Sequence, residues 1–223
     1  VYPQNADFTF YGGLYRDVNI IAVNNSHFDL EYYGTPGIKV TPEVVGEHAK
    51  VDVEVFVKNA KENQKLVYTI KDREGNVVAQ RETTASQKEA IFEIENVHLW
   101  HGRKDPYLYS VEVLLKENDE ILDNVSTRFG CRTFKIDPEL GFILNGEEYP
   151  LRGMVVWAEI PYISTHMPKG RENTITQMKE LVVQNYNHPS IVVWGLSNEI
   201  TMSGDSTEDL RENHVILNDL VHE

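Results

Sequence analysis

Residues 49–136 alternate apolar and polar side chains over several short stretches. In the first of them Val51, Val53, Val55 and Val57 alternate with Asp52 and its neighbours, a period of two that predicts a strand with one buried face. Further strands are expected over residues 65–71, 77–80, 90–95, 107–115 and 121–134, with a Gly-containing hairpin loop at 72–76. Short strands separated by turns about every ten residues indicate an antiparallel sandwich of the immunoglobulin type.

The stretch before this sandwich is irregular. Residues 8–22 have the pattern of strand and tight turn around Gly12-Gly13, which is too little chain to bury a core of its own. Pro36 and Pro42 predict turns in the next stretch, because proline fixes its backbone angle and lacks an N–H donor. We therefore expect a linker near these prolines.

The pattern changes after residue 138. A short hairpin is expected around residues 142–150, and then two uninterrupted apolar runs, 154–157 and 191–194, predict strands that are covered on both faces. Apolar residues at helical spacing between the runs predict a crossover helix over 171–187. Ser206 and Asp209 fit a capping box that opens a second helix, with Leu210 and Leu217 on one side. Strand, helix, strand and helix together predict an α/β unit.

Both apolar runs end in the same way, with a tryptophan followed by a carboxylate. The first ends in Trp157-Ala158-Glu159, and the second runs from Trp194 to Asn198-Glu199. Because the carboxyl ends of parallel strands lie at one rim, we expect these side chains to meet there. Paired carboxylates beside aromatic rings suit a glycosidase, in which one acid protonates the leaving oxygen and flat rings pack on sugar faces. The alternative is that both glutamates only cap strand ends or bind backbone amides.

The composition of the chain limits the classes of partner that it can bind. The chain has 223 residues, and its 35 Asp plus Glu against 21 Lys plus Arg give a net charge of -14, which disfavours nucleic acid in the absence of a basic patch. No apolar run reaches the roughly 20 residues of a membrane span. The single Cys131 offers neither an intramolecular disulfide nor a cysteine zinc site. The N-terminus lacks the features of a signal peptide, which leaves the compartment open and slightly favours a cytoplasmic location.

Four ordered segments carry a resemblance to a known family. The segment Trp194-Gly195-Leu196-Ser197-Asn198-Glu199 resembles the fourth-strand signature of glycoside hydrolase family 2. Residues 11–18 look like the last strands of that family's sugar-binding jelly roll. Residues 142–146 with 151–153 look like the entry to its catalytic TIM barrel, and residues 187–190 look like the turn before the fourth strand.

The resemblance implies a multidomain chain. Residues 1–34 would end a jelly roll, residues 35–136 would form the all-β immunoglobulin-like sandwich, and residues 137–223 would form an incomplete (β/α)8 TIM-barrel portion. The family's first strand leads into a long segment before its third strand, whereas Gly153 in this chain is followed directly by Met154. Adjacent parallel strands need a crossover of about a dozen residues, so we interpret this junction as an apparent deletion.

The resemblance also implies an activity. Residues 157–161 and 197–201 look most like bacterial β-galactosidases, which implies retaining hydrolysis of terminal β-D-galactosides. Glu199 would be the general acid/base, Asn198 would hydrogen-bond the sugar's 2-hydroxyl, and Glu159 would face the pocket in a supporting, substrate-binding role. Trp194 is expected to be core rather than a sugar platform. β-Glucuronidase and β-mannosidase activities remain alternatives, as does a non-catalytic immunoglobulin-like binding or spacer module.

Further expectations concern the missing parts of the site. The family's nucleophile lies on the seventh strand and has no counterpart in this sequence, so the chain alone is expected to be inactive. No cofactor is required, although the resemblance allows Mg²⁺ or Na⁺. His166 follows a segment that resembles a cation-site loop, but Ser164 stands where a carboxylate ligand is expected, so no metal ligand is assigned. We expect the partner to be a carbohydrate substrate. The resemblance also allows a homo-oligomer, because members of the family often form oligomers.

Overall fold

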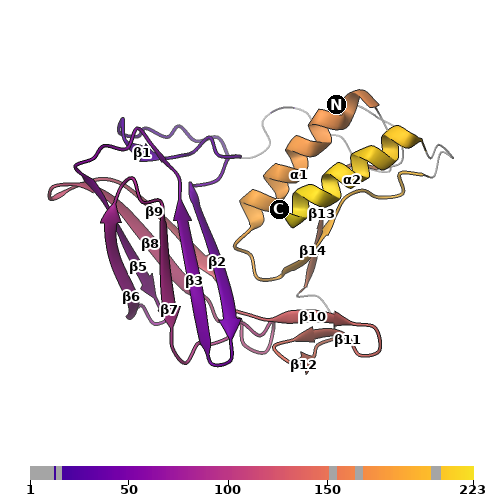
Figure 1. Ribbon diagram of the computed structural model, residues 1–223, viewed down its shortest axis with the longest axis horizontal. Helices are drawn as coiled ribbons and strands as arrows, with labels where there is room; N and C mark the ends of the chain where they lie inside the picture. The colour runs from indigo at the N-terminus through magenta and orange to yellow at the C-terminus, as the bar shows by residue number, and fades with distance from the viewer. Residues whose placement is uncertain (1–12, 14–16, 151–154, 164–167, 202–206) are drawn as a thin grey trace.

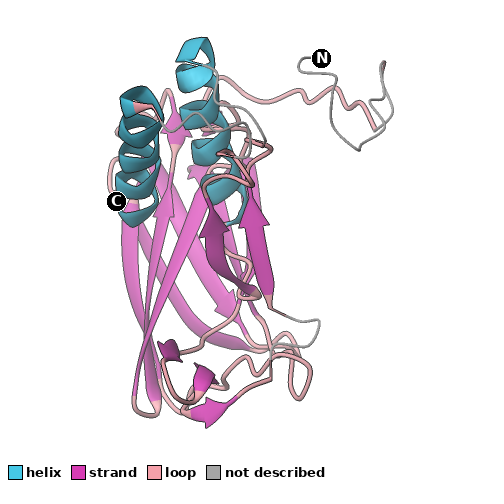
Figure 2. Cartoon of the chain, turned by 90° about the vertical axis from the view of Figure 1, so that its right-hand side faces the viewer, coloured by secondary structure: helices cyan, strands magenta, loops and turns pink. Residues whose placement is uncertain are grey.

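The structure, a computed structural model, describes residue 13 and residues 17–150, 155–163, 168–201 and 207–223. Figure 1 shows two parts, a β-sandwich and a smaller α/β unit in which two helices lie side by side next to a pair of strands. Figure 2, turned by 90°, shows the same two helices adjacent to each other. The predicted class, an immunoglobulin-like sandwich followed by part of a barrel, is confirmed.

The sandwich consists of two antiparallel sheets. One has the order β2-β3-β7 and the other the order β6-β5-β8-β9. Val51, Val53 and Val55 are fully buried, as their alternation predicts, and they pack in one cluster with Leu66 and Tyr68 of the opposite sheet. The strand bounds are β2 (Ile38–Val45), β3 (His48–Val55), β5 (Gln64–Lys71), β6 (Val77–Thr84), β7 (Glu89–Ile94), β8 (Tyr109–Glu117) and β9 (Glu120–Phe129).

The turn predicted at Pro42 is wrong, whereas residues 35–37 around Pro36 carry no strand and contain bends, as predicted. Pro42 lies inside β2 and is paired opposite Val51 of β3. Proline is tolerated in a strand when that strand is at the edge of its sheet, because no second neighbour needs the missing N–H. β2 is such an edge in the three-stranded sheet.

The strand predicted over residues 8–22 is also wrong for its described part. Residues 17–24 carry no strand, and Val18, Ile20 and Ile21 are 68%, 99% and 66% exposed. A strand needs a neighbour for its backbone groups and a layer to cover its apolar face, and this segment has neither among the described residues. The first described strand is β1 (His27–Phe28), which pairs with β4 (Val57–Lys58). Residues 1–12 and 14–16, the main part of the predicted jelly-roll end, lie outside the described residues.

A small antiparallel sheet joins the two parts of the chain. It contains β10 (Phe134–Asp137), β11 (Gly141–Leu144) and β12 (Glu147–Glu148). Asn145 and Gly146 turn the predicted hairpin with φ angles of 51° and 82°, values that Asn and Gly adopt at low cost. The predicted boundary at 136/137 falls within β10.

The α/β unit follows the predicted order. β13 (Val156–Glu159) and β14 (Ile191–Gly195) are parallel, and α1 (Arg171–Asn185) connects them after the short 3-10 turn η1 (Pro168–Gly170). The second helix, α2 (Glu208–His222), begins one residue later than the capping box predicts. Its cap is Thr207, whose hydroxyl accepts from the Leu210 amide at 3.2 Å. Thr207 is the residue three positions before that amide, which is the spacing an N-cap requires; Ser206 lies outside the described residues.

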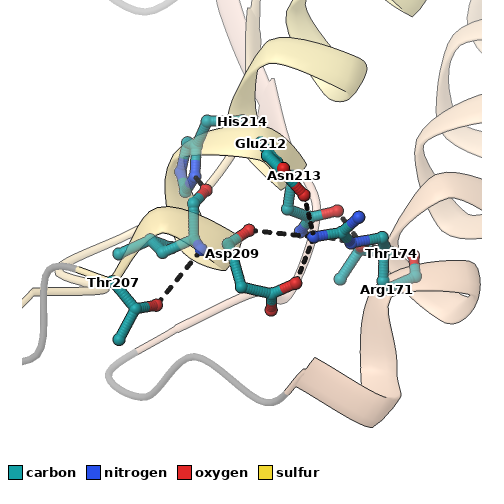
Figure 3. A network of polar contacts seen from close by, with 8 residues as sticks. Arg171, Thr174, Thr207, Asp209, Glu212, Asn213 and His214 are labelled. Carbon is teal, nitrogen blue, oxygen red and sulfur yellow. Dashed lines mark hydrogen bonds and ion pairs between the residues drawn. The ribbon is translucent and has the colours of Figure 1, made fainter.

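The two helices pack on each other through apolar and polar contacts. Met178 of α1 and Leu217 of α2 are fully buried in a cluster that also contains residues following both strands. Figure 3 shows the polar contacts, in which Arg171 of α1 binds Asp209 and Glu212 of α2. In the part of the chain that the structure describes, no helix is long and apolar enough to cross a membrane.

Candidate active site

The ends of β13 and β14 lie side by side. Their register places Glu159 opposite Gly195, and the segments beyond them stay paired. The Ile160 amide donates to the Gly195 carbonyl at 3.3 Å, and the Asn198 amide donates to the Tyr162 carbonyl at 2.9 Å. The structure therefore brings the two predicted carboxylate segments to the same rim, at the carboxyl ends of the strands.

Glu199 has an unusual backbone. Its φ is 51°, in the left-handed region, where four of the other five described non-glycine residues are asparagines. A glutamate held there costs about 1–3 kcal/mol, and such residues cluster at functional sites. The flanking residues hold it in place, since the Asn198 amide is hydrogen-bonded and Ile200 is buried in the helix cluster. Glu199 is an exposed residue at this rim.

Glu159 lies next to an exposed indole. The Trp157 Nε1–H donates to Glu159 Oε2 at 3.0 Å, and Trp157 is 64% exposed. Gly195 makes this arrangement possible, because a Cβ there would lie 2.6 Å from Glu159 Oε2. The rim thus presents a flat ring and a carboxylate together. Trp194, the predicted core tryptophan, is partly buried and lies opposite Ala158.

The residue before Asn198 is fixed by a histidine that the sequence pattern does not single out. Ser197 Oγ lies 2.8 Å from His214 Nε2, and His214 Nδ1 lies 2.9 Å from the Leu210 carbonyl oxygen. The ring of Tyr162 packs near the His214 ring, with centroids 5.8 Å apart. Burial raises the pKa of Tyr162, and a hydrogen bond with the Asn213 side chain opposes that shift. These contacts tie the Glu199 segment to α2.

The described residues show no metal centre. No group of three or more His, Cys, Asp or Glu among them is arranged to hold an ion. His166 and Ser164, which bear on the cation-site resemblance, lie outside the described residues.

Comparison with known families covers most of the chain. Residues 36–132 match the profile of glycosyl hydrolases family 2, and residues 137–219 match the profile of the TIM barrel domain of the same family. The chain belongs to glycosyl hydrolase family 2. Within this family 2 chain, the rim of β13 and β14 is where described carboxylates and an exposed indole come together.

Individual relatives agree with the family. The crystal structure of an FMN-binding β-glucuronidase from Facaelibacterium prausnitzii has a TM-score of 0.92 and 34% identity, covering 98% of this chain and 42% of that one. A β-glucuronidase of Bacteroides fragilis is 28% identical over 92% of this chain and 40% of its own length. A β-galactosidase of Thermoanaerobacter pseudethanolicus is 29% identical over 73% of this chain and 22% of its own length. The chain thus spans less than half the length of these family 2 relatives.

Proposed function

We propose that this chain supplies the acid/base side of the active site of a retaining β-glycosidase. Glu199 protonates the departing glycosidic oxygen and then, as a carboxylate, takes a proton from the attacking water. The observation that carries the proposal is the placement of Asn198-Glu199 beyond the carboxyl end of β14, with Glu199 exposed and held in a left-handed backbone.

The neighbouring residues bind the sugar. The Asn198 side chain hydrogen-bonds the 2-hydroxyl, a contact that strengthens in the transition state. Glu159 accepts from sugar hydroxyls, while the exposed Trp157 ring beside it packs on the sugar face. Glu159 therefore has a supporting role rather than that of nucleophile.

Retaining hydrolysis needs a second carboxylate about 5–5.5 Å from the first. We assign this nucleophile to a part of a longer parent polypeptide beyond these 223 residues, and we expect the chain alone to be inactive. A longer parent is supported by the B. fragilis relative, because this chain covers only 40% of that relative's length. The alignment of 277 residues includes 92% of this chain, so it contains gaps opposite extra residues of the relative, as a missing segment would produce.

The sugar is a β-D-glucuronide or a β-D-galactoside, and a β-D-mannoside is the remaining alternative. The names of the relatives from F. prausnitzii and B. fragilis favour the glucuronide. The resemblance of residues 157–161 and 197–201 to β-galactosidases, and the T. pseudethanolicus relative, favour the galactoside. Measuring kcat/KM of the full-length polypeptide for the 4-nitrophenyl β-glucuronide, β-galactoside and β-mannoside decides between them, and turnover of none would favour the non-catalytic module.

The acid/base assignment is tested with Glu199→Gln in the full-length polypeptide that carries these residues. We expect hydrolysis of the phenyl β-glycoside to fall by about 10²–10⁴-fold, because a poor leaving group needs protonation. The rate of the first step on the 2,4-dinitrophenyl β-glycoside should not change, and added azide should restore the overall turnover of this substrate. Glu180→Gln, an exposed glutamate on α1, is the matched control. Unchanged hydrolysis of the phenyl glycoside by Glu199→Gln would reject the assignment.

We further propose that this chemistry requires no cofactor, since proton transfer and nucleophilic attack by carboxylates complete the reaction. Dialysis against a chelator should leave the rate unchanged. A loss that is restored by Mg²⁺ would point instead to a cation site.

A further inference from the structure

We infer that His214 is a positioning residue for Glu199, acting through its hydrogen bond with Ser197. The inference rests on the proposed acid/base role of Glu199. His214 lies on α2 and Ser197 lies two residues before Glu199, so the contact links the helix to the segment that carries the acid.

The hydrogen bonds determine the tautomer of the neutral His214 ring. Its Nδ1 faces the Leu210 carbonyl oxygen at 2.9 Å, and a carbonyl can only accept, so Nδ1 carries the hydrogen. In the neutral ring Nε2 then accepts, and the donor is the Ser197 hydroxyl at 2.8 Å. The ring therefore cannot turn over without losing both contacts, and the Ser197 side chain is held in one direction.

The helix behind His214 is bound to its neighbouring helix by several contacts. Figure 3 shows α2 tied to α1 by the Arg171 contacts with Asp209 and Glu212, and by a second pair one turn further along. In that second pair the Asn213 side chain, fully buried, donates to Thr174 Oγ1 at 3.2 Å. His214 follows Asn213 directly. Its anchor is thus a helix that is fixed to its neighbour by buried polar and apolar contacts.

The Glu199 segment needs such an anchor. A left-handed glutamate persists only when its surroundings determine its backbone more strongly than its own preference does. Tyr162 holds Asn198 from the β13 side through its carbonyl, and His214 holds Ser197 from the α2 side. With one side released, the carboxyl would sample positions in which it misses the leaving oxygen.

The test compares two substitutions at His214 in the full-length polypeptide. His214→Phe keeps a ring against Tyr162 and removes both hydrogen bonds, whereas the carbonyl oxygen of His214→Gln can still accept from Ser197. His222→Phe is the matched control, because His222 is on the same helix and makes the same bond to a carbonyl four residues earlier, at 2.7 Å. Ser197→Ala removes the shared bond from the other side.

The expected effect depends on the leaving group. His214→Phe should lower kcat/KM for the phenyl β-glycoside about tenfold and that for the 2,4-dinitrophenyl β-glycoside less than twofold, since misplacement weakens proton donation only. His214→Gln should recover most of the loss, and Ser197→Ala with His214→Phe should be no worse than either alone. Equal losses on both substrates, or the same loss from His222→Phe, would overturn the inference.

A second measurement is independent of activity. Hydrogen exchange in the peptide 197–201 should accelerate in His214→Phe and Ser197→Ala but not in His222→Phe, because the Asn198 amide loses protection. Unchanged exchange would overturn the inference. Glu199→Gln serves as the reference: if it spares phenyl glycoside hydrolysis, the proposed function fails, whereas if only His214→Phe is without effect, the positioning role fails alone.

Discussion

Replacing Gly195 with alanine tests the rim most directly. An added Cβ would lie 2.6 Å from Glu159 Oε2 and 2.7 Å from its Cγ, and closer still to Trp157 Nε1. These separations are shorter than real Cβ contacts, so one partner has to move. Because Trp157 and Glu159 are both exposed, we expect their side chains to swing into solvent while the backbone of β14 stays in place.

The energetic terms for Gly195→Ala nearly offset each other. The lost hydrogen bond between Trp157 and Glu159 is worth about 0.5–1.5 kcal/mol. Alanine in a strand is favoured over glycine by about 0.5–1 kcal/mol. The free energy of unfolding should therefore change by less than about 1 kcal/mol. On the proposed function, the displaced rim should nevertheless lower kcat/KM about tenfold, equivalent to about 1.4 kcal/mol of transition-state stabilisation.

Two assays separate these outcomes. Denaturant unfolding of the chain gives the change in stability, and kcat/KM of the full-length polypeptide gives the change at the rim. Trp157→Phe is the companion variant, because it removes the same hydrogen bond and adds no atom at Gly195. A stability loss of several kcal/mol would show that the backbone moves instead of the side chains. Full activity, with Glu159 unmoved in a crystal structure of Gly195→Ala, would refute the packing argument.

Three further predictions concern stability and reactivity. Burial, and then the neighbouring Glu89 carboxylate, raise the pKa of Asp52 to about 6, so the folded state binds the extra proton and stability falls as the pH rises from about 4 to 6. Asp52→Asn should consequently raise the Tm at pH 7.5 and leave it unchanged at pH 3.5; an equal rise at both would contradict this sign. Burial raises the pKa of Cys131 to about 12, so a thiol reagent should label it only on unfolding, and rapid labelling of the native chain would be inconsistent with its burial. Asn213→Ala removes a fully buried amide and should cost about 1–3 kcal/mol by thermal unfolding, whereas the exposed Asn218→Ala should cost little.

The fold could be predicted wherever burial imposes a simple period. The alternation at Val51, Val53 and Val55 marks a strand because one face of β3 is covered by the other sheet. The turn expected at Pro42 does not form, because proline is tolerated in β2 as an edge strand, and edge position is a property of the assembled sheet. The strand expected at residues 18–21 does not form for a related reason, since a strand-like sequence forms no strand without a neighbour.

The candidate site likewise contains residues that the sequence predicts and a residue that it does not. Glu159 and Glu199 could be selected because both follow apolar runs, and parallel strands end at one rim. His214 shows no ligand spacing, and its contact with Ser197 depends on where α2 packs. One signal was present: His214 lies four residues after Leu210 and three before Leu217, on the buried stripe of the helix. A polar residue on such a stripe needs a partner, although the sequence does not say which one.

The Asn198-Glu199 dipeptide is therefore only part of what positions the Glu199 carboxyl. Its backbone strain, about 1–3 kcal/mol, is offset by contacts from separate elements: the Tyr162 carbonyl after β13, the His214 ring on α2, and the helix cluster that buries Ile200. No single one of these elements supplies all three contacts. A piece of chain that keeps the β14 motif but lacks α2 would retain Asn198 and Glu199 and lose the geometry that directs the Glu199 carboxyl.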